Sequence, residues 1–387
     1  MRRIACKERP HWQQQADEFG FKFHTMYGEP YWDENAYYTF TLKQIEDDIE
    51  APTEALHQMC LAAVDKVVRD DFWMSQFKIP ASQWDFIARS WQQREPSLYS
   101  RFDLAYTGNG PAKLLENNAD TPTSLYETGF WQWLWLEDKI ASGELPTNTD
   151  QFNSLQDKLV NWFSAYQQKT GIRDMHFACC KDTDEDRGTV QYLEDCAKAA
   201  GIKSQFVFIE DIGLGEHGHF TDLDDHVIET AFKLYPWEFM LTEDYGQYLA
   251  KANVNWIEPP WKTILSNKAL MPLLWTMFPN HPNLLPAFFD SDPKKSELKD
   301  YVKKPFFSRE GANISIIKDG QTLVDSDGPY GEEGFIYQAY SPLPAFDDNI
   351  TLIGSWLVDD KAAGMAIRED KALITQDLSR FLPHVIL

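Results

Sequence analysis

The spacing of apolar residues predicts helices in the first third of the chain. From Leu56 to Val68 they recur every three or four positions, which is the repeat of a helix with one buried face. Thr41 and Gln44 fit a capping box, in which each side chain binds the backbone N–H group of the other residue. Thr121 before Pro122 predicts a second helix start, and the aromatic-rich run Phe130–Leu136 predicts that this helix is buried on nearly all sides.

The middle of the chain alternates between strand and helix patterns. The short apolar runs Met175–Cys180 and Ser204–Ile209 flank a helical stretch, Gly188–Ala200, which Gly201 closes. A strand, a helix and a second strand in this order are typical of a β-α-β unit, whose strands lie parallel. We therefore expect a Rossmann-like lobe in this part of the chain.

Beyond about residue 300, the pattern is that of antiparallel hairpins. Val302–Ser308 and Asn313–Lys318 are strand-like, and the latter ends in Asp319-Gly320, a strong turn signal. Thr351–Val358 and Ala362–Arg368 flank a polar turn and predict a second hairpin. The expected fold class is α+β, with a Rossmann-like middle and an antiparallel C-terminal sheet.

Composition and charge narrow the classes of function. Of 387 residues, 43% are apolar and 25% charged, as in soluble globular proteins, and no stretch of 18 or more apolar residues occurs. Asp and Glu number 60 against 36 Lys and Arg, and the net charge of −24 repels nucleic acids and anionic membranes and attracts cations. The five cysteines form no CxxC motif. We expect a cytoplasmic, reduced protein whose partners are neither nucleic acid nor membrane; its oligomeric state stays open.

Two short segments carry the ligands of a candidate metal site. Arg101 and Asp103 are two positions apart, as are Glu116 and Asn118, so each pair shares one face of a strand. If the two strands are neighbours, Asp103, Glu116 and Asn118 meet. An all-oxygen trio of this kind suits Mg²⁺, and Arg101 beside it could neutralise a phosphoryl group. A solvated hairpin of charged residues is the alternative interpretation.

Further charged residues could hold other groups of a ligand. Lys304 leads from a strand into the loop Ser308–Asn313, whose N–H groups could cover the phosphates of a nucleotide. Lys268 begins an apolar helical stretch, and its simpler interpretation is a surface lysine with a partly buried stem. The acidic run Asp182–Asp186 follows a predicted strand and would suit an ammonium group. The alternative for this run is a solvated loop at a helix start.

Two motifs do not support a function. Residues Gly213–Gly218 match G-x-G-x-x-G after a strand, but the acidic residues that follow do not fit a pyrophosphate-binding helix. His217 and His219 have no partnering Cys or His at ligand spacing, so we expect them in an exposed loop. The sequence also contains no pattern of a serine or cysteine hydrolase or of a P-loop.

Several separated motifs of the sequence resemble the glutathionylspermidine synthetase family of ATP-grasp carboxylate–amine ligases. Within this family, the sequence is similar to the stand-alone bacterial members, which lack the amidase domain. The resemblance covers nearly the whole chain, from about Arg9 to about Pro383, and predicts a single ligase unit. The motifs that carry it are Arg101-Phe102-Asp103, Glu116–Asp120, Asn267–Leu270, Lys304-Pro305, Arg309–Ile314 and Ile367–Asp370.

The resemblance implies a fold and its division into lobes. The fold is that of an ATP-grasp ligase, with a Rossmann-like (pre-ATP-grasp) middle lobe and an antiparallel C-terminal sheet that clamps the nucleotide. The approximate lobes are residues 1–165 for metal and acid binding, 166–260 for the Rossmann-like part and 261–387 for the nucleotide.

The resemblance also implies roles for individual residues. Arg101 and Arg368 match the catalytic arginines that stabilise the reacting phosphoryl and acyl groups. Asp103, Glu116 and Asn118 match the metal ligands, which are expected to hold two Mg²⁺ ions. The expected ATP contacts are Arg101, Asp103, Lys268, Lys304, Gly311, Ala312 and Gln338. The expected substrate contacts are the acid-binding hydroxyls of Thr121 and Thr123 and the acidic pair Glu185 and Asp186.

The implied activity is the ATP-dependent joining of a small-molecule or peptide carboxylic acid to a cationic amine through an acyl phosphate. Departures from the family pattern concern the substrates. Thr121 and Thr123 stand in place of Ser, Asp186 in place of Glu, Phe239 in place of Thr and Glu310 in place of Cys. Glutathione and spermidine are therefore open as substrates. A non-catalytic ATP- or ligand-binding protein that retains the fold is the alternative, and a kinase that stops at the phosphorylated acid is a third.

Overall fold

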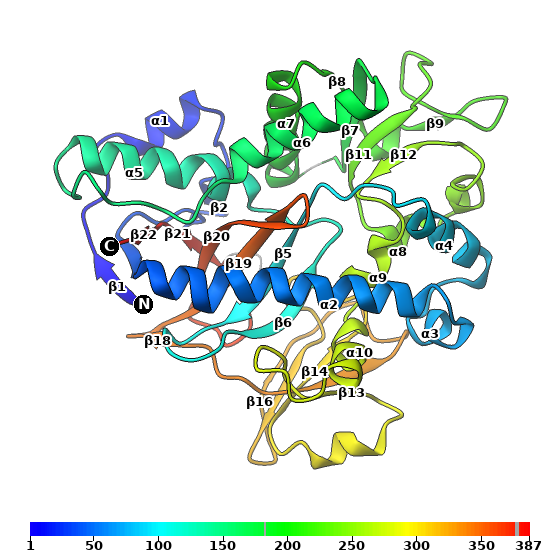
Figure 1. Ribbon diagram of the computed structural model, residues 1–387. Helices are drawn as coiled ribbons and strands as arrows, with labels where there is room; N and C mark the ends of the chain where they lie inside the picture. Colours follow the sequence, from blue (N-terminus) through cyan, green and yellow to red (C-terminus); the bar gives the residue numbers. More distant parts are fainter. Residues whose placement is uncertain (182, 376–378) are drawn as a thin grey trace.

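The computed structural model describes residues 1–181, 183–375 and 379–387 (Figure 1). At its centre is an antiparallel sheet that combines distant parts of the chain. β5 (Tyr99–Ala105) pairs with β6 (Lys113–Asn118) on one side and with β19 (Asn349–Val358) on the other. The sheet is completed by β18 (Ala345–Phe346), β20 (Lys361–Asp370) and β21 (Arg380–Leu382). The first and last thirds of the chain therefore share one sheet.

The expected β-α-β unit is confirmed as part of a four-stranded parallel sheet. α7 begins at Asp184 rather than at Gly188, because three acidic residues occupy its first turn, where carboxylates interact favourably with a helix N-terminus. The strands lie in the order β12-β11-β7-β8. The bounds are β7 (Asp174–Cys179), α7 (Asp184–Ala199), β8 (Lys203–Phe208), β11 (Thr230–Leu234) and β12 (Asn255–Ile257). Asp182 of the predicted acidic run lies outside the described residues.

The two hairpins predicted after residue 300 are confirmed, but they belong to different sheets. The first, β14 with β15, is followed by a turn in which Asp319 and Gly320 have φ of 49° and 75°, as a tight hairpin turn requires. The second, β19 with β20, joins the central sheet instead. The first hairpin lies in a separate antiparallel sheet with the strand order β13-β17-β14-β15-β16. The bounds of these strands are β13 (Ala287–Phe289), β14 (Tyr301–Pro305), β15 (Ser315–Lys318), β16 (Gln321–Asp325) and β17 (Phe335–Ala339).

The capping box and the amphipathic helix of the first third are confirmed. Thr41 N–H donates to Gln44 Oε1 at 3.0 Å, and Gln44 N–H donates to Thr41 Oγ1 at 3.2 Å. The chain continues through a π-helical segment, Gln44–Glu50, into α2 (Ala51–Val67), which crosses in front of the central sheet in Figure 1. The side chains at the predicted helical spacing are buried along α2: Leu56, Met59, Cys60, Ala63, Val64 and Val67.

The helix start predicted at Thr121 is wrong. Helical residues begin only at Leu125, continue through the π-helical segment Glu127–Trp131 and pass into α5 (Gln132–Ala141). Ser124 has a left-handed backbone with φ of 70°, through which a right-handed helix does not pass. The prediction that this helix is buried on nearly all sides is also wrong, because the Trp133 side chain is 46% exposed.

The remaining elements surround these sheets. Short strands are β1 (Arg2–Ala5), β2 (Thr25–Met26), β3 (Glu29–Pro30), β4 (Ala36–Phe40), β9 (Gly213–Leu214), β10 (Phe220–Thr221) and β22 (His384–Ile386). Further helices are α1 (Trp12–Glu18), α3 (Asp71–Gln76), α4 (Trp84–Gln92), α6 (Leu155–Thr170), α8 (Trp237–Met240), α9 (Lys262–Ser266) and α10 (Leu270–Met277). α6 packs against α7, beside the parallel sheet (Figure 1).

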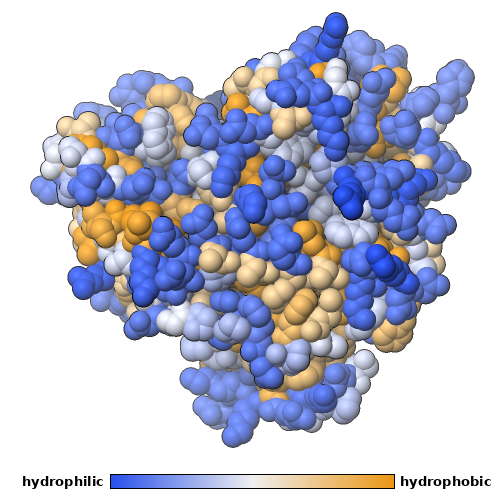
Figure 2. Space-filling model, in the orientation of Figure 1, coloured by the Kyte–Doolittle hydropathy of each residue, from blue (hydrophilic) through white to orange (hydrophobic). Residues whose placement is uncertain are grey.

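The surface agrees with the strongly charged sequence. Hydrophilic residues cover most of the face drawn in Figure 2. Among the described residues, none of the helices combines the length and apolar character that a membrane span requires. The expected lobe boundaries at residues 165 and 260 stay a prediction.

Candidate active site

The candidate site is a cavity of about 680 Å³ at the junction of the central and parallel sheets. Most of the residues predicted for function line it, although they come from six separate segments of the chain. They are Arg101, Asp103, Glu116, Asn118, Thr121, Thr123, Glu185, Asp186, Lys268, Gly311 and Arg368. Lys304 and Gln338 line a smaller adjoining cavity of about 100 Å³, which shares Asp103, Glu116 and Lys268 with the larger one. Ala312 lines neither cavity.

The paired strands β5 and β6 bring the predicted oxygen ligands together. In the antiparallel register, Arg101 lies opposite Asn118 and Asp103 lies opposite Glu116. Arg101 Nε donates to Asp103 Oδ1 at 2.8 Å, and Asn118 Nδ2 donates to Glu116 Oε1 at 3.4 Å. The pairing follows from the turn at Gly108 and Gly110, both of which have positive φ. The alternative of a solvated hairpin is wrong, since Arg101 and Asp103 are buried.

Two lysines supply positive charge beside these ligands. Lys268 Nζ lies 3.1 Å from Glu116 Oε2 and donates to the Ser308 carbonyl at 2.6 Å. Lys304 Nζ donates to Gln338 Oε1 at 2.8 Å. Lys268 and Lys304 are both buried, so the interpretation of Lys268 as a surface lysine is wrong. A buried pair of cations beside a carboxylate forms a local anion site in an otherwise acidic protein.

The electrostatics of this side favour an ionised ligand set. Burial acts to raise the pKa of Glu116, but the charges of Lys268 and Lys304 outweigh it and lower that pKa to about 2. Burial lowers the pKa of Lys304 to about 8, against the opposing effect of Glu116. Glu116 is therefore ionised at neutral pH, with its oxygens available to a cation.

The smaller cavity has the features of a site for a flat apolar group. Its walls include the strand residues Val302, Ile316 and Leu352 together with Ile314 and Ile374 from loops. At its polar end, Gln338 Nε2 is held by the Leu114 carbonyl at 3.1 Å while Gln338 Oε1 accepts from Lys304. The polar groups at one end and the apolar walls at the other suit a nucleotide base next to its phosphates.

The loop Ala119–Thr123 follows β6 and forms another wall of the large cavity. Arg101 Nη1 donates to the Thr123 carbonyl at 2.9 Å, which ties the loop to β5. Arg309 Nη1 donates to Thr121 Oγ1 at 2.8 Å, while its Nη2 donates to Glu238 Oε1 at 2.7 Å. Sequence reasoning assigned no role to Arg309, although it lies in a motif that carried the family resemblance. Its partner Glu238 stands 71 residues earlier, and no local pattern connects the two.

A further part of the cavity lining is acidic. Glu185 Oε1 accepts from the Tyr31 hydroxyl at 2.7 Å, and Asp186 follows in the first turn of α7. Burial and the neighbouring Glu185 raise the pKa of Asp186 to about 7. The solvated loop that was the alternative for this run is not what the structure has, because both residues are partly buried in a helix.

A third carboxylate in this acidic part was missed in the sequence. Glu127 is 1% exposed and lies close to Tyr31 and Glu185. Burial and the negative charge of Glu185 raise its pKa to about 8. The signal was a carboxylate three residues before the aromatic-rich run Phe130–Leu136, because Glu is seldom buried without a role.

The remaining predicted residues lie at the rim and in the loops around the cavity. Arg368 extends from β20, and its guanidinium carbon lies 5.2 Å from the ring centre of Phe381. Gly311 has φ of +73°, and a Cβ atom there would come within 2.5 Å of Ile374 Cγ2. The residues Gly213–Gly218 form strand β9 and most of the turn before β10, and they do not start a helix. His217 and His219 are exposed, as expected.

A search of the described residues finds no group of three or more His, Cys, Asp or Glu side chains arranged for a metal ion. The candidate trio contains only two such residues, since its third member is Asn118. Oxygen ligands from two carboxylates and one amide fit Mg²⁺, which keeps part of its water shell and binds phosphate oxygens. The donor chemistry of β5 and β6 is therefore compatible with Mg²⁺.

Comparison with known proteins places these residues in a family. The sequence model of the glutathionylspermidine synthase preATP-grasp family matches residues 3–387 of the chain. A protein of Haemophilus influenzae, whose name proposes an acid–amine ligase, is 40% identical over 388 residues that cover 97% of each chain. The bifunctional glutathionylspermidine synthetase/amidase of Escherichia coli is 25% identical, and the match covers 91% of this chain but 59% of that protein.

A comparison of structures agrees with the sequence relatives. A glutathione synthetase-like effector from Globodera pallida, solved in its apo form, superposes with a TM-score of 0.57 at 10% identity and covers 98% of both chains. At this identity the likeness shows the fold alone. The chain belongs to the glutathionylspermidine synthase preATP-grasp family and is an ATP-dependent ligase that forms carbon–nitrogen bonds, in agreement with the enzyme class that the sequence motifs imply.

Proposed function

We propose that the chain joins a peptide-like carboxylic acid to a cationic, polyamine-like amine through an acyl phosphate, in an ATP-grasp type of active site. The observation that carries this proposal is the set of charges in two adjoining cavities. Lys268 and Lys304 line the smaller one together with Asp103 and Glu116, whereas Glu185 and Asp186 line only the larger one, which Arg101 and Arg368 also line. Such a set suits an anionic nucleotide in the smaller cavity and an acid and a cationic amine in the larger one.

The proposed nucleotide site is the smaller cavity together with the adjoining lysines. The apolar walls around Val302 and Ile316 suit the adenine ring, with Gln338 beside it. Lys268 and Lys304 would then lie along the phosphates, and the loop 307–312, which includes Gly311, would cover them. The antiparallel β13–β17 sheet supports this loop, as a clamp over a nucleotide requires.

The proposed metal site comprises Asp103, Glu116 and Asn118. Mg²⁺ bound there would offset the charge that develops on the phosphate oxygens during transfer. The arginine and lysine partners of these carboxylates would turn to the phosphates in the same step. Their present ion pairs, Arg101 with Asp103 and Lys268 with Glu116, keep the side chains in place until then.

The proposed acid site is the 119–123 loop facing Arg101. The hydroxyls of Thr121 and Thr123 would bind the acid, and its carboxylate oxygen would attack the γ-phosphorus of ATP. The bond from this phosphorus to ADP breaks as the acyl phosphate forms. Arg101 and Arg368 would stabilise the transferring phosphoryl group, since a guanidinium can hold two oxygens at once.

The proposed amine site is the acidic part of the cavity lining. Glu185 and Asp186 line the cavity as partly desolvated carboxylates, with the buried Glu127 close to Glu185, and this favours an amine with more than one charge. The reacting nitrogen first loses one proton to solvent, which frees its lone pair; it then attacks the acyl carbon, phosphate leaves and the nitrogen loses a second proton to give the amide. By the sequence resemblance, Thr121 and Thr123 in the acid site and Asp186 and Phe239 near the amine site differ from the residues of family members that use glutathione and spermidine, so the proposal is a substrate class.

The placement of the arginines argues against the alternative of a non-catalytic binding protein that retains the fold. Such a protein would keep the nucleotide contacts but would not need cations placed for a transferring phosphoryl group, since only transition-state interactions accelerate a reaction. Arg101 and Arg368 both line the cavity from separate strands, which favours the ligase.

The test measures ADP release with Mg²⁺ and ATP across panels of acids and amines, glutathione and spermidine included. A ligase releases ADP at full rate only when both an acid and an amine are present. A kinase needs the acid alone, and a binding protein responds to neither. Glu116→Ala and Asn118→Ala should abolish turnover at limiting Mg²⁺; normal turnover in both would contradict the metal assignment.

A further inference from the structure

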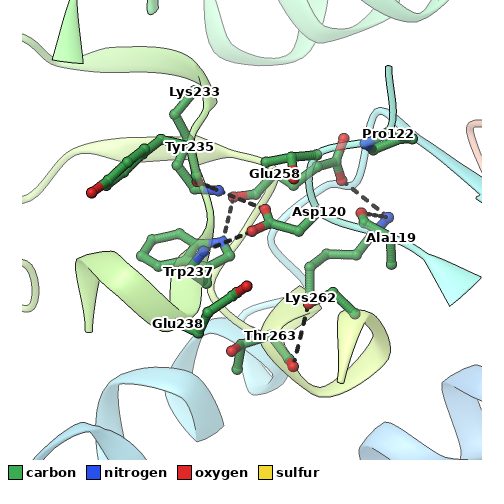
Figure 3. Close-up of polar contacts among 12 residues, drawn as sticks. Ala119, Asp120, Pro122, Lys233, Tyr235, Trp237, Glu238, Glu258, Lys262 and Thr263 are labelled. Carbon is green, nitrogen blue, oxygen red and sulfur yellow. Dashed lines mark hydrogen bonds and ion pairs between the residues drawn. The ribbon is translucent and has the colours of Figure 1, made fainter. Parts of the chain in front are cut away.

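A network of buried charges lies directly behind the 119–123 loop (Figure 3). Asp120 has no exposed surface, and both of its oxygens are engaged. Its Oδ1 lies 2.5 Å from Lys233 Nζ on β11, and its Oδ2 accepts the backbone N–H of Trp237 at 2.8 Å. One carboxylate thus ties the end of β6 to β11 and to the start of α8.

The same network reaches the loop on the other side of the cavity. Trp237 is followed by Glu238, whose Oε1 accepts from Arg309 Nη2 at 2.7 Å. Arg309 in turn donates to Thr121, the residue next to Asp120. The contacts therefore form a closed ring that passes through the 119–123 loop, α8 and the 307–312 loop.

We propose that Asp120 and Lys233 are a positioning pair, which holds the 119–123 loop and the 307–312 loop in register across the cavity. Because both Asp120 oxygens already bind protein donors, the pair acts through Trp237, Glu238 and Arg309 and not by contact with a substrate. The inference rests on the proposed function only where it treats Thr121 as an acid contact. The coupling of the two loops follows from the contacts alone.

Stability does not by itself explain why the pair is charged. Replacing a buried ion pair with apolar residues of similar volume is often neutral or stabilising, whereas removing one partner leaves a buried charge without compensation. Lys233 also donates to the Tyr235 carbonyl at 2.9 Å and lies 4.5 Å from the centre of the Trp237 ring. These directional contacts fix the start of α8, which is what a positioning role requires.

The test compares Asp120→Leu, Lys233→Met and the double variant by thermal denaturation and by backbone hydrogen exchange, with no substrate present. Each single variant should lower Tm strongly, and the double variant should recover much of that loss because no lone charge remains. The double variant should still exchange about tenfold faster in both the 119–123 and the 307–312 loops, while β5 and β19 keep their protection.

The control is a second buried pair outside the network, Arg9 with Glu34, joined at 2.7 Å. The double variant Arg9→Met/Glu34→Leu should change Tm without faster exchange in the two loops. If the Asp120 and Lys233 double variant does not fold, Asp120→Asn, which keeps an acceptor for the Trp237 N–H group, should speed exchange in the two loops to a smaller degree.

If hydrogen exchange in both loops is unchanged in the double variant, the pair has only a structural role. If exchange is faster in the 119–123 loop alone, the two loops are not coupled through the pair. Because the measurement needs no substrate, its outcome is independent of whether the ligase reaction proceeds with any tested acid. Binding of a non-hydrolysable ATP analogue with Mg²⁺ should weaken in the Asp120 and Lys233 double variant and stay unchanged in the Arg9 and Glu34 control, because the proposed function places the 307–312 loop over the phosphates.

Discussion

Single residues in the cavity are placed by partners that stand far away in the sequence. Asp103, Glu116 and Asn118 could be predicted as a group because a two-residue period puts them on neighbouring strand faces. Arg309 could not be assigned its contacts, since Glu238 and Thr121 belong to other segments that only the folded chain brings near. Glu127 likewise reaches Glu185 only through the packing of its helix against α7.

The raised pKa of Asp186 predicts a pH-dependent stability. Burial and Glu185 raise this pKa to about 7, from an ordinary value of about 3.9. The folded protein therefore binds a proton that the unfolded chain has lost, and stability falls as pH rises from about 4 to about 7. Asp186→Asn removes this effect, so its Tm should exceed that of the unmodified protein by a few degrees at pH 8 and by less at pH 5.5.

The matched control for Asp186 is Asp184→Asn, two residues earlier in the first turn of α7 and exposed. It should give no gain that grows between pH 5.5 and pH 8 in thermal denaturation. The same Asp186→Asn variant should bind a polycationic amine more weakly, because it lacks a carboxylate. Equal gains at both pH values would show that desolvation of this carboxylate does not limit stability.

Arg101 is expected to matter through its geometry and not only through its charge. It donates from Nε to Asp103 and from Nη1 to the Thr123 carbonyl, so one planar group connects the metal ligands to the 119–123 loop. Arg101→Lys keeps the charge but cannot make both contacts. Turnover should fall by about 10²–10³-fold, as when one stabilising donor is lost. The Arg101→Lys variant should still bind a non-hydrolysable ATP analogue, as measured by calorimetry. Full activity of this variant would contradict the proposed role of the guanidinium.

At the scale of elements, local signals were reliable and long-range ones were not. The capping box at Thr41 and the Asp319-Gly320 turn could be predicted because their hydrogen bonds close within a few residues. The helix start at Thr121 failed because tertiary contacts hold that loop: Asp120 binds the start of α8, and Arg101 binds the Thr123 carbonyl. An N-cap sequence is a weak signal when such contacts compete with it.

Gly311 in the 307–312 loop predicts a specific loss of nucleotide binding. An alanine there would adopt an unfavourable left-handed backbone, and its Cβ would lie 2.9 Å from the Thr375 carbonyl oxygen and closer still to Ile374. The loop would shift away from the cavity. Gly311→Ala should therefore weaken binding of an ATP analogue by about tenfold or more in calorimetry, for an added cost above about 1.4 kcal/mol.

Gly320→Ala separates backbone strain from the effect on the loop. Gly320 also has positive φ, at +75°, but no atom lies within 4 Å of its added Cβ, and it belongs to the β15–β16 turn. It should lower stability without changing nucleotide affinity. If both variants weaken the affinity equally, the loop at Gly311 has no special contact with the nucleotide.

For the whole molecule, the fold class could be predicted but the joining of its ends could not. The α+β class and the parallel middle sheet follow from the order of apolar periods. Yet β19 pairs with β5 across some 250 residues of sequence, and no local pattern specifies such a pairing. This pairing matters for the site, because it places Arg368 of β20 in the same cavity as Arg101 of β5.

The overall charge predicts how salt affects the proposed reaction. With a net charge of −24, the chain attracts a cationic amine over distances up to the screening length, which is about 10 Å at 0.1 M salt. The kcat/KM for the amine should therefore fall as NaCl is raised from 50 to 300 mM, and more steeply for an amine with three charges than for one with a single charge. Hydroxylamine, which is neutral near pH 7.5, provides the control nucleophile, and its kcat/KM should depend little on salt.

The kcat/KM for ATP should rise with salt or stay unchanged, because Lys268 and Lys304 act on ATP only at short range, inside the buried part of the site. Steady-state rates at fixed pH would measure each dependence, and equal slopes for singly and triply charged amines would mean that the acidic field of the molecule does not guide the amine.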